Sequence, residues 1–180
     1  MGNNIHPSHE EIDKVQKKFT ELLQEHWIKH DLFGWDWWLL LALTIIPWFI
    51  WWKVFDRSRS TAIVLYGLLI TLLATFLDII GWNFHLWSYP HTLIPIYPPM
   101  FPADLTIFPV IYMVVYQYFK SWKSFFWAMV VASLIFSFIG EPLMIWLEFY
   151  EMNYWKHIYS FPIYIALALG IKWLVDKITL

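Results

Sequence analysis

The stretch that decides the fold is residues 61–80, which read TAIVLYGLLITLLATFLDII. Asp78 is its only charged residue, and an α-helix of about 20 residues reaches about 30 Å, the thickness of the hydrocarbon core of a bilayer. Four further stretches are similar in length and apolar content, at about 37–54, 103–119, 124–147 and 158–175. The sequence therefore predicts an all-α, polytopic membrane helix bundle with five transmembrane helices.

The composition favours lipid as the solvent for much of the chain. Of 180 residues, 59% are hydrophobic and 14% are charged, whereas roughly 25% are charged in an ordinary soluble domain. A soluble domain of this size has too little interior to bury so much apolar surface. We expect a multi-pass protein of the cell membrane whose partners are membrane lipids. The net charge of −2 predicts no binding to nucleic acid, and the lack of cysteine excludes disulfides and thiolate chemistry.

The first 33 residues are predicted to form a region of their own, 1–33, ahead of a transmembrane domain at 34–180. Ser8 and Glu11 have the spacing of a capping box, in which side chains and backbone exchange hydrogen bonds at a helix start. Apolar residues then recur at helical spacing, while acidic and basic residues share the other faces in nearly equal number. We expect an N-terminal amphipathic helix that is ended by Gly34. It either packs on the protein or lies at the membrane interface.

The loop between the second and third spans, residues 81–102, is rich in proline and aromatic residues and has no Lys or Arg. Proline lacks a backbone donor and breaks helices, so this loop cannot be a sixth span. A long loop without regular structure is often functional. Two interpretations stay open, a lid over a binding site and a passive cap at the interface.

Lys and Arg are spread unevenly over the two predicted sides of the bundle, and such residues favour the cytoplasmic side. One side carries Lys53, Arg57, Arg59, Lys120, Lys123, Lys172 and Lys177. Outside the N-terminal helix, the other side carries only Lys156. This predicts a cytoplasmic C-terminus, with the N-terminus, the loop 81–102 and residues 148–157 on the outer side.

Three acids fall within the predicted spans, where an ionisable group costs roughly 2.5 to 3.5 kcal/mol on insertion scales. Asp78, Asp104 and Glu141 all lie toward the outer ends of their helices in this topology. Polar residues three and four apart share helix faces with them, so we predict an acid-lined pocket near the outer face, with the three acids as candidate catalytic groups. For the Ser and Thr residues, simple helix packing is the alternative. The candidate pocket residues are Thr71, Thr75, His85, Trp87, Tyr89, Tyr112, Tyr116, Ser133 and Ser137.

The histidines give a weaker signal. His26 and His30 have a spacing that can hold a metal ion, but no third ligand is evident, so no metal site is predicted. His85, His91 and His157 lie on the predicted outer side, where they either pair with the acids or are ordinary interfacial residues. The sequence has no phosphate-binding glycine loop, nucleophile elbow, HExxH or dinucleotide fingerprint, so no cofactor is expected.

Several tracts are distinctive: Trp35-Asp36-Trp37-Trp38, Phe76-Leu77-Asp78, Ile139-Gly140-Glu141-Pro142 and, at 155–162, WKHIYSFP. With these tracts, the region from about 33 to 175 resembles a family of small integral membrane proteins of Gram-positive, spore-forming bacteria with no assigned activity. The resemblance implies a membrane location.

A second, partial resemblance covers residues 75–116. Asp78, Gly81, the tract Trp87-Ser88-Tyr89 and the tract Pro102-Ala103-Asp104 are similar to a repeat of the membrane-embedded lycopene cyclases. In that family the acids are thought to protonate a polyene end. Leu105 stands where the family has a second acid, and the resemblance implies a shared lipid-binding scaffold.

Three functions are compatible with these observations. The chain could bind or act on a hydrophobic ligand, lipid or isoprenoid-like, that enters from the outer leaflet under the proline-rich loop. It could be a small proton-coupled transporter or an oligomeric permease. It could instead be a non-catalytic membrane assembly partner that docks through its N-terminal helix. The sequence leaves open whether the chain is an enzyme and whether it forms a homo-oligomer.

Overall fold

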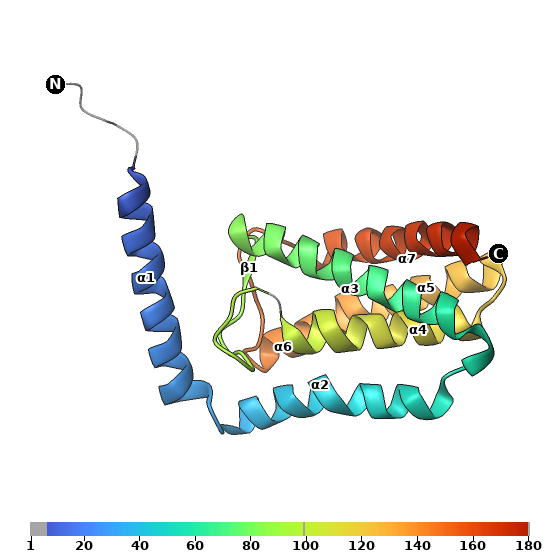
Figure 1. Ribbon diagram of the computed structural model, residues 1–180, viewed down its shortest axis with the longest axis horizontal. Coiled ribbons are helices and arrows are strands. Elements are labelled where there is room, and N and C mark those ends of the chain that lie inside the picture. Colours follow the sequence, from blue (N-terminus) through green and yellow to red (C-terminus); the bar gives the residue numbers. More distant parts are fainter. Residues whose placement is uncertain (1–6, 99, 180) are drawn as a thin grey trace.

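A computed structural model describes residues 7–98 and 100–179, in which most of the long helices run side by side (Figure 1). In this part of the chain, four helices are long and apolar enough to cross a membrane, at 35–54, 57–83, 122–146 and 157–179. The first is α2 (Trp35–Val54), and the fourth is α7 (His157–Thr179). The second consists of η2 (Arg57–Arg59) and α3 (Ser60–Asn83). The third consists of α5 (Trp122–Ile135), η4 (Phe136–Gly140) and α6 (Glu141–Trp146). The prediction of an α-helical membrane-type bundle is therefore confirmed.

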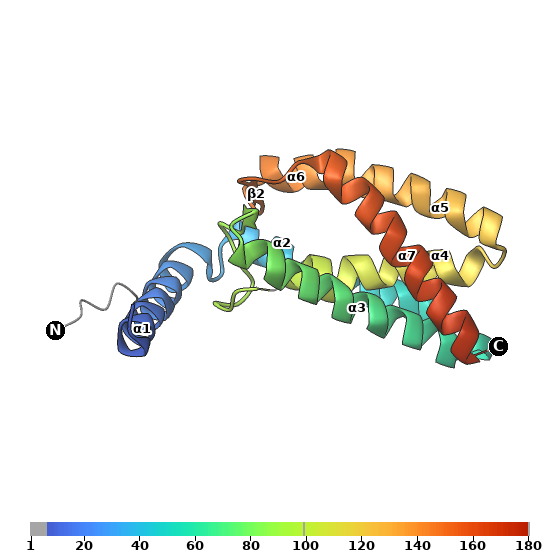
Figure 2. The same ribbon diagram turned by 90° about the horizontal axis from the view of Figure 1, so that it is seen from above.

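The third predicted span, 103–119, is helical but short. It consists of η3 (Ala103–Ile107) and α4 (Phe108–Tyr118). Most side chains of α4 are buried, because the helix packs against α2, α3 and α5. Figure 2 shows α7 crossing the bundle obliquely, and α7 contacts both α3 and α5.

The N-terminal helix α1 (His9–His26) lies beyond one end of the bundle and runs across the direction of the long helices (Figure 1). Its predicted capping box is present, because Glu11 N donates to Ser8 Oγ at 3.2 Å and Ser8 N donates to Glu11 Oε2 at 2.7 Å. None of its residues is buried. The helical path continues through η1 (Trp27–Asp31), and Gly34 is the N-cap of α2. The expectation that Gly34 ends the first helix was therefore wrong, since that helical segment ends three residues earlier.

The loop end of the bundle, which lies beside α1, is organised by a small sheet. Strand β1 (Trp87–Ser88) pairs antiparallel with β2 (Glu151–Met152), with Trp87 opposite Met152. Helix α3 extends to Asn83, so the loop is shorter than predicted. The sheet ties this loop to the connection between α6 and α7.

The opposite end of the bundle, which we call the C-terminal end, holds the larger apolar core. Tyr66 of α3 stacks on Tyr116 of α4, with ring centroids 4.4 Å apart, and both rings lie nearly perpendicular to the ring of Phe125. The outward faces stay apolar as well; Leu68 and Leu72 of α3 are more than 60% exposed. An apolar exterior of this kind fits a lipid surrounding.

Within the described residues, three segments are π-helical: η1, η3 and η4. Pro109 and Pro142 each follow such a segment by two residues. A proline cannot donate to the carbonyl four residues before it, and the wider π turn is one way in which a helix absorbs that loss. As a result, Asp104 lies inside η3 and Glu141 directly follows η4.

Candidate functional site

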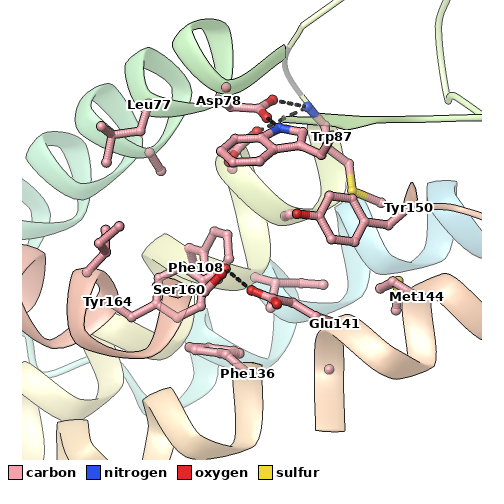
Figure 3. Close-up of a pocket in the computed structure, with 18 of the residues that line it drawn as sticks. Leu77, Asp78, Trp87, Phe108, Phe136, Glu141, Met144, Tyr150, Ser160 and Tyr164 are labelled. Carbon is pink, nitrogen blue, oxygen red and sulfur yellow. Dashed lines mark hydrogen bonds between the residues drawn. The ribbon is translucent and has the colours of Figure 1, made fainter. Parts of the chain in front are cut away.

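A cavity of about 350 Å³ lies near the loop end of the bundle, and Asp78, Asp104 and Glu141 all line it (Figure 3). Its walls come from α3, η3, α4, α6, α7 and the loop that contains β1. Most of the lining is apolar or aromatic, including Ile70, Ala74, Leu77, Phe108, Phe136, Met144 and Leu167. Three acids from three separate helical segments therefore share one largely apolar chamber.

Asp78 and Asp104, which we call the aspartate pair, are buried side by side. Asp78 Oδ1 accepts the indole N–H of Trp87 at 2.7 Å and the hydroxyl of Tyr89. The backbone N–H of Met100 donates to Asp78 Oδ2 at 3.1 Å and to Asp104 Oδ2 at 3.0 Å. Neutral donors thus hold the pair, and the two carboxyl groups meet at one backbone N–H.

Gly81 makes the approach of Trp87 possible. The six-membered ring of Trp87 occupies the place that a Cβ at residue 81 would take. Gly81 follows Asp78 by three residues, so the glycine and the acid lie on neighbouring positions of the same helix face. The loop can therefore bring its indole donor against α3 only because residue 81 has no side chain.

Glu141 forms the second polar station, which we call the glutamate site. Its Oε1 accepts the Tyr164 hydroxyl at 2.8 Å, and its Oε2 lies 2.7 Å from His157 Nδ1. The backbone carbonyl of Tyr164 in turn accepts the Tyr112 hydroxyl at 3.0 Å. Helix α7 supplies both partners of the carboxylate, and it thereby fixes the orientation of Glu141.

Tyr150 lies between these two stations (Figure 3). Burial raises the pKa of its phenol above the ordinary value, and negative charge at Glu141 and Asp78 raises this pKa further. The pKa of Tyr89 is likewise raised well above the ordinary value, first by burial and then by Asp78. Both phenols are therefore protonated hydrogen-bond donors at neutral pH.

The structure brings only some of the predicted pocket residues together. Trp87, Tyr89 and Tyr112 line the cavity with the three acids. Tyr116 lies at the C-terminal end, where its hydroxyl donates to Asp176 at 2.8 Å. The other predicted residues outside the cavity lining are Thr71, Thr75, His85, Ser133 and Ser137.

These residues lie elsewhere for identifiable reasons. His85 is exposed in the loop, with a φ of 53°. The hydroxyls of Thr75, Ser133 and Ser137 are buried and have no hydrogen-bond partner in the described part of the chain. Small side chains at such positions let helices approach one another, which was the alternative interpretation for them.

Sequence reasoning missed the lining residues that follow α6. Tyr150, Trp155, Ser160 and Tyr164 all belong to the cavity, and Trp155 Nε1 donates to Ser160 Oγ at 2.9 Å. The distinctive tract at 155–162 was the available signal, because it contains Trp155 and Ser160 together with His157, the partner of Glu141.

Comparison of the chain with protein-family models, with curated proteins and with solved structures finds no match. The resemblances noted in the sequence therefore stay predictions, and the geometry of the cavity is the basis for a functional proposal.

Proposed function

We propose that the protein binds, or acts on, a hydrophobic ligand of lipid or isoprenoid type in the acid-lined cavity. The observation that carries this proposal is a largely apolar chamber of about 350 Å³ with carboxyl groups at two stations. Ligand pockets commonly have this volume and combine apolar walls with a few polar groups that orient the ligand. An apolar body would fill the centre, and one polar group or double bond would face an acid.

The two stations differ in what they offer a ligand. The aspartate pair can hold a proton between its carboxyl groups and present it to the cavity. Glu141, bonded to an imidazole and a phenol, is suited to accept a proton or a polar head group. In a catalytic version, a proton added to the ligand at one station and a proton removed at the other would give an isomerisation or a cyclisation, with no net proton consumed. In a non-catalytic version, the same groups bind a hydroxyl or a head group.

Entry from the side of the bundle fits this ligand class. Leu77 and Ile80 of α3 line the cavity, and they are also 38% and 37% exposed on the surface of the bundle. Ile163 and Leu167 of α7 line the cavity as well. A ligand dissolved in lipid would pass between α3 and α7, while the loop with β1 covers the end of the chamber.

The proposed topology counts five spans, with the η3–α4 segment as the third, in the cell membrane. The N-terminus lies outside and the C-terminus inside, as the distribution of Lys and Arg favours. With the long helices along the membrane normal, α1 lies in the plane of the outer surface (Figure 1). Its exposed apolar stripe, which includes Val15 and Leu22, then meets the interface.

Lipid analysis of the purified protein tests the proposal. Native mass spectrometry of the full chain, extracted from its own membrane, is expected to show a bound hydrophobic molecule. Asp78→Asn and Glu141→Gln are expected to reduce its occupancy at least tenfold, and the matched carboxyl-to-amide control Glu21→Gln, on exposed α1, is expected to retain it. Equal occupancy in the two cavity variants and in the control would contradict the proposal.

A further inference from the structure

A second cluster of ionisable groups lies outside the ligand cavity, at the junction of η1, α2 and the loop. His91 Nδ1 lies 2.7 Å from Asp31 Oδ1 and 3.1 Å from Asp36 Oδ2. The three potential ligand atoms lie within 4.8 Å of one another. The residues come from three separate segments of the chain, so the fold assembles the cluster and no local sequence motif encodes it.

The two carboxylates of the cluster are buried and have imidazoles as their partners. Asp31 is 2% exposed and Asp36 is 5% exposed. Their ion-pair partners among the described residues are histidines, with no Lys or Arg between them. A buried carboxylate is costly unless it is paired or coordinates a metal, and imidazole is itself a common metal ligand.

The hydrogen bonds of the two carboxylates are also unequal. Asp31 Oδ2 accepts the backbone N–H of Thr92 at 3.1 Å. Asp36 Oδ2 has His91 Nδ1 as its ion-pair partner at 3.1 Å. Asp36 is therefore a buried acid that both meets His91 and lines the neighbouring cavity.

Space and additional donors lie beside this cluster. A cavity of about 540 Å³ is lined by His30, Asp36, His91 and Glu148. On the other side, His26 Nε2 lies 3.9 Å from Asp31 Oδ1. An ion could therefore reach the cluster, and nitrogen or oxygen ligands are at hand to complete its coordination.

We propose that Asp31, Asp36 and His91 bind a divalent transition-metal ion of the Zn²⁺ type at the loop end of the bundle. Imidazole combined with carboxylates is a common ligand set for Zn²⁺, whereas Ca²⁺ and Mg²⁺ favour oxygen ligands alone. The pair His26 and His30, which lacked a third ligand in the sequence, stands at the edge of this cluster. The site is independent of the ligand cavity and of its proposed function.

The bound ion would fasten the loop to the start of α2. The loop backbone already meets this region, because Trp37 Nε1 donates to the carbonyl of Leu93 at 2.9 Å and Trp27 Nε1 donates to the carbonyl of Thr92 at 3.1 Å. A metal that joins Asp31 and Asp36 to His91 adds a bond across the same junction. Because metal that binds the folded state alone stabilises that state, binding is expected to raise the melting temperature.

The test uses the full chain in detergent, purified without a histidine tag and stripped of metal with a chelator. Zn²⁺ is titrated by calorimetry and the melting temperature is followed in parallel. One Zn²⁺ per chain is expected, with a rise in melting temperature. His91→Gln and Asp36→Asn are expected to weaken binding at least about tenfold, and each variant serves if the other fails to fold. His85→Gln, an exposed histidine of the same loop, is the matched control and keeps wild-type binding.

Three results would overturn the assignment. The first is the absence of saturable Zn²⁺ binding to the wild-type chain. The second is wild-type affinity in either His91→Gln or Asp36→Asn. The third is saturation by Ca²⁺ without binding of Zn²⁺, which would show that the imidazole is not a ligand.

Discussion

The two ends of the bundle both bury ionisable groups, but they neutralise them in opposite ways. At the C-terminal end, Lys172 is 2% exposed and donates to Asp176 Oδ2 at 2.8 Å. Its ammonium lies 4.9 Å from the ring centre of Tyr116, over which Arg59 also sits at 5.2 Å. At the loop end, the acids of the cavity have indole, phenol, imidazole and backbone partners, and within the described residues none of these acids pairs with a Lys or Arg.

This difference separates a structural charge from one that is available for chemistry. A carboxylate that faces a fixed ammonium is neutralised permanently, and the pair has little left to offer a ligand. A carboxyl group held by neutral donors can take up, share or release a proton, and it can turn toward a ligand group. Lys172 and Asp78 are both buried, so burial does not distinguish a structural charge from a functional one. The identity of their hydrogen-bond and ion-pair partners does.

The largest expected effect of a single substitution lies at the C-terminal end. Lys172→Met leaves Asp176 without its cation and is expected to cost about 3–5 kcal/mol of unfolding free energy. Denaturation in mixed micelles measures this cost. The double variant Lys172→Met/Asp176→Asn should recover much of the loss, because no charge is left unpaired. A single variant as stable as the wild type would show that the pair does not support this end.

A smaller loss is expected at the contact between the loop and α3. In Gly81→Ala, the new Cβ meets the Trp87 ring, and overpacking of this kind costs about 1–3 kcal/mol. The indole must move away from Asp78, so Trp fluorescence should change together with ligand occupancy. Gly170→Ala is the control, since nothing lies within 4 Å of its added Cβ. Equal stability and equal ligand occupancy of the two variants would show that Trp87 does not contribute to the site.

Neutralising an acid of the cavity should cost still less. Glu141→Gln keeps the size of the side chain and an oxygen for Tyr164, so a loss of about 1 kcal/mol or less is expected. The same denaturation measurement as for Lys172→Met gives a direct comparison of the two ends. If Glu141→Gln were as destabilising as Lys172→Met, the acid would be structural and the contrast between the ends would fail.

The smallest effect concerns pH at the loop end. Burial raises the pKa of Tyr97 to about 12, whereas a free tyrosine has a pKa of about 10. The folded state therefore favours the neutral phenol. The resulting contribution to the free energy of unfolding is fully present below about pH 10 and is lost as the pH rises through about 12. Tyr97→Phe should lose less stability between pH 9 and about 11 than the wild type, as followed by melting temperature. If the melting temperatures of both proteins fell equally over this pH range, the raised pKa of Tyr97 would be contradicted.

The sequence was sufficient for the bundle and insufficient for the details of the site. The lengths of the apolar stretches and the capping residues of the first helix predict the helices, because these signals are local in the sequence. The positions of Asp78, Asp104 and Glu141 in one cavity also followed from helix ends and topology. Which partner each acid takes depends on long-range packing. Helical spacing alone does not tell that His157 contacts Glu141 while His91 contacts Asp31.

The polar stripes below the acids misled for a related reason. Thr71, Ser133 and Ser137 share helix faces with Asp78 or Glu141, yet none of them lines the cavity, although Ile70 and Phe136 at neighbouring positions do. Spacings of three and four define a broad arc around a helix, and on α3 the cavity takes the side of that arc that holds Ile70 and Ala74 rather than Thr71. The π turns at η3 and η4 add to this difficulty, because each shifts the register of the residues that follow.

Helix α1 is connected to Asp78 by a short series of side-chain contacts. The ring of Phe19 lies 6.4 Å from the ring of Tyr97, whose hydroxyl donates to the backbone carbonyl of Tyr89. The hydroxyl of Tyr89 then reaches Asp78. A helix with no buried residue of its own is thus connected to an acid of the cavity through two tyrosines, Tyr97 and Tyr89. A displacement of α1 is therefore expected to change the contacts of Tyr97 first and those of Asp78 through Tyr89.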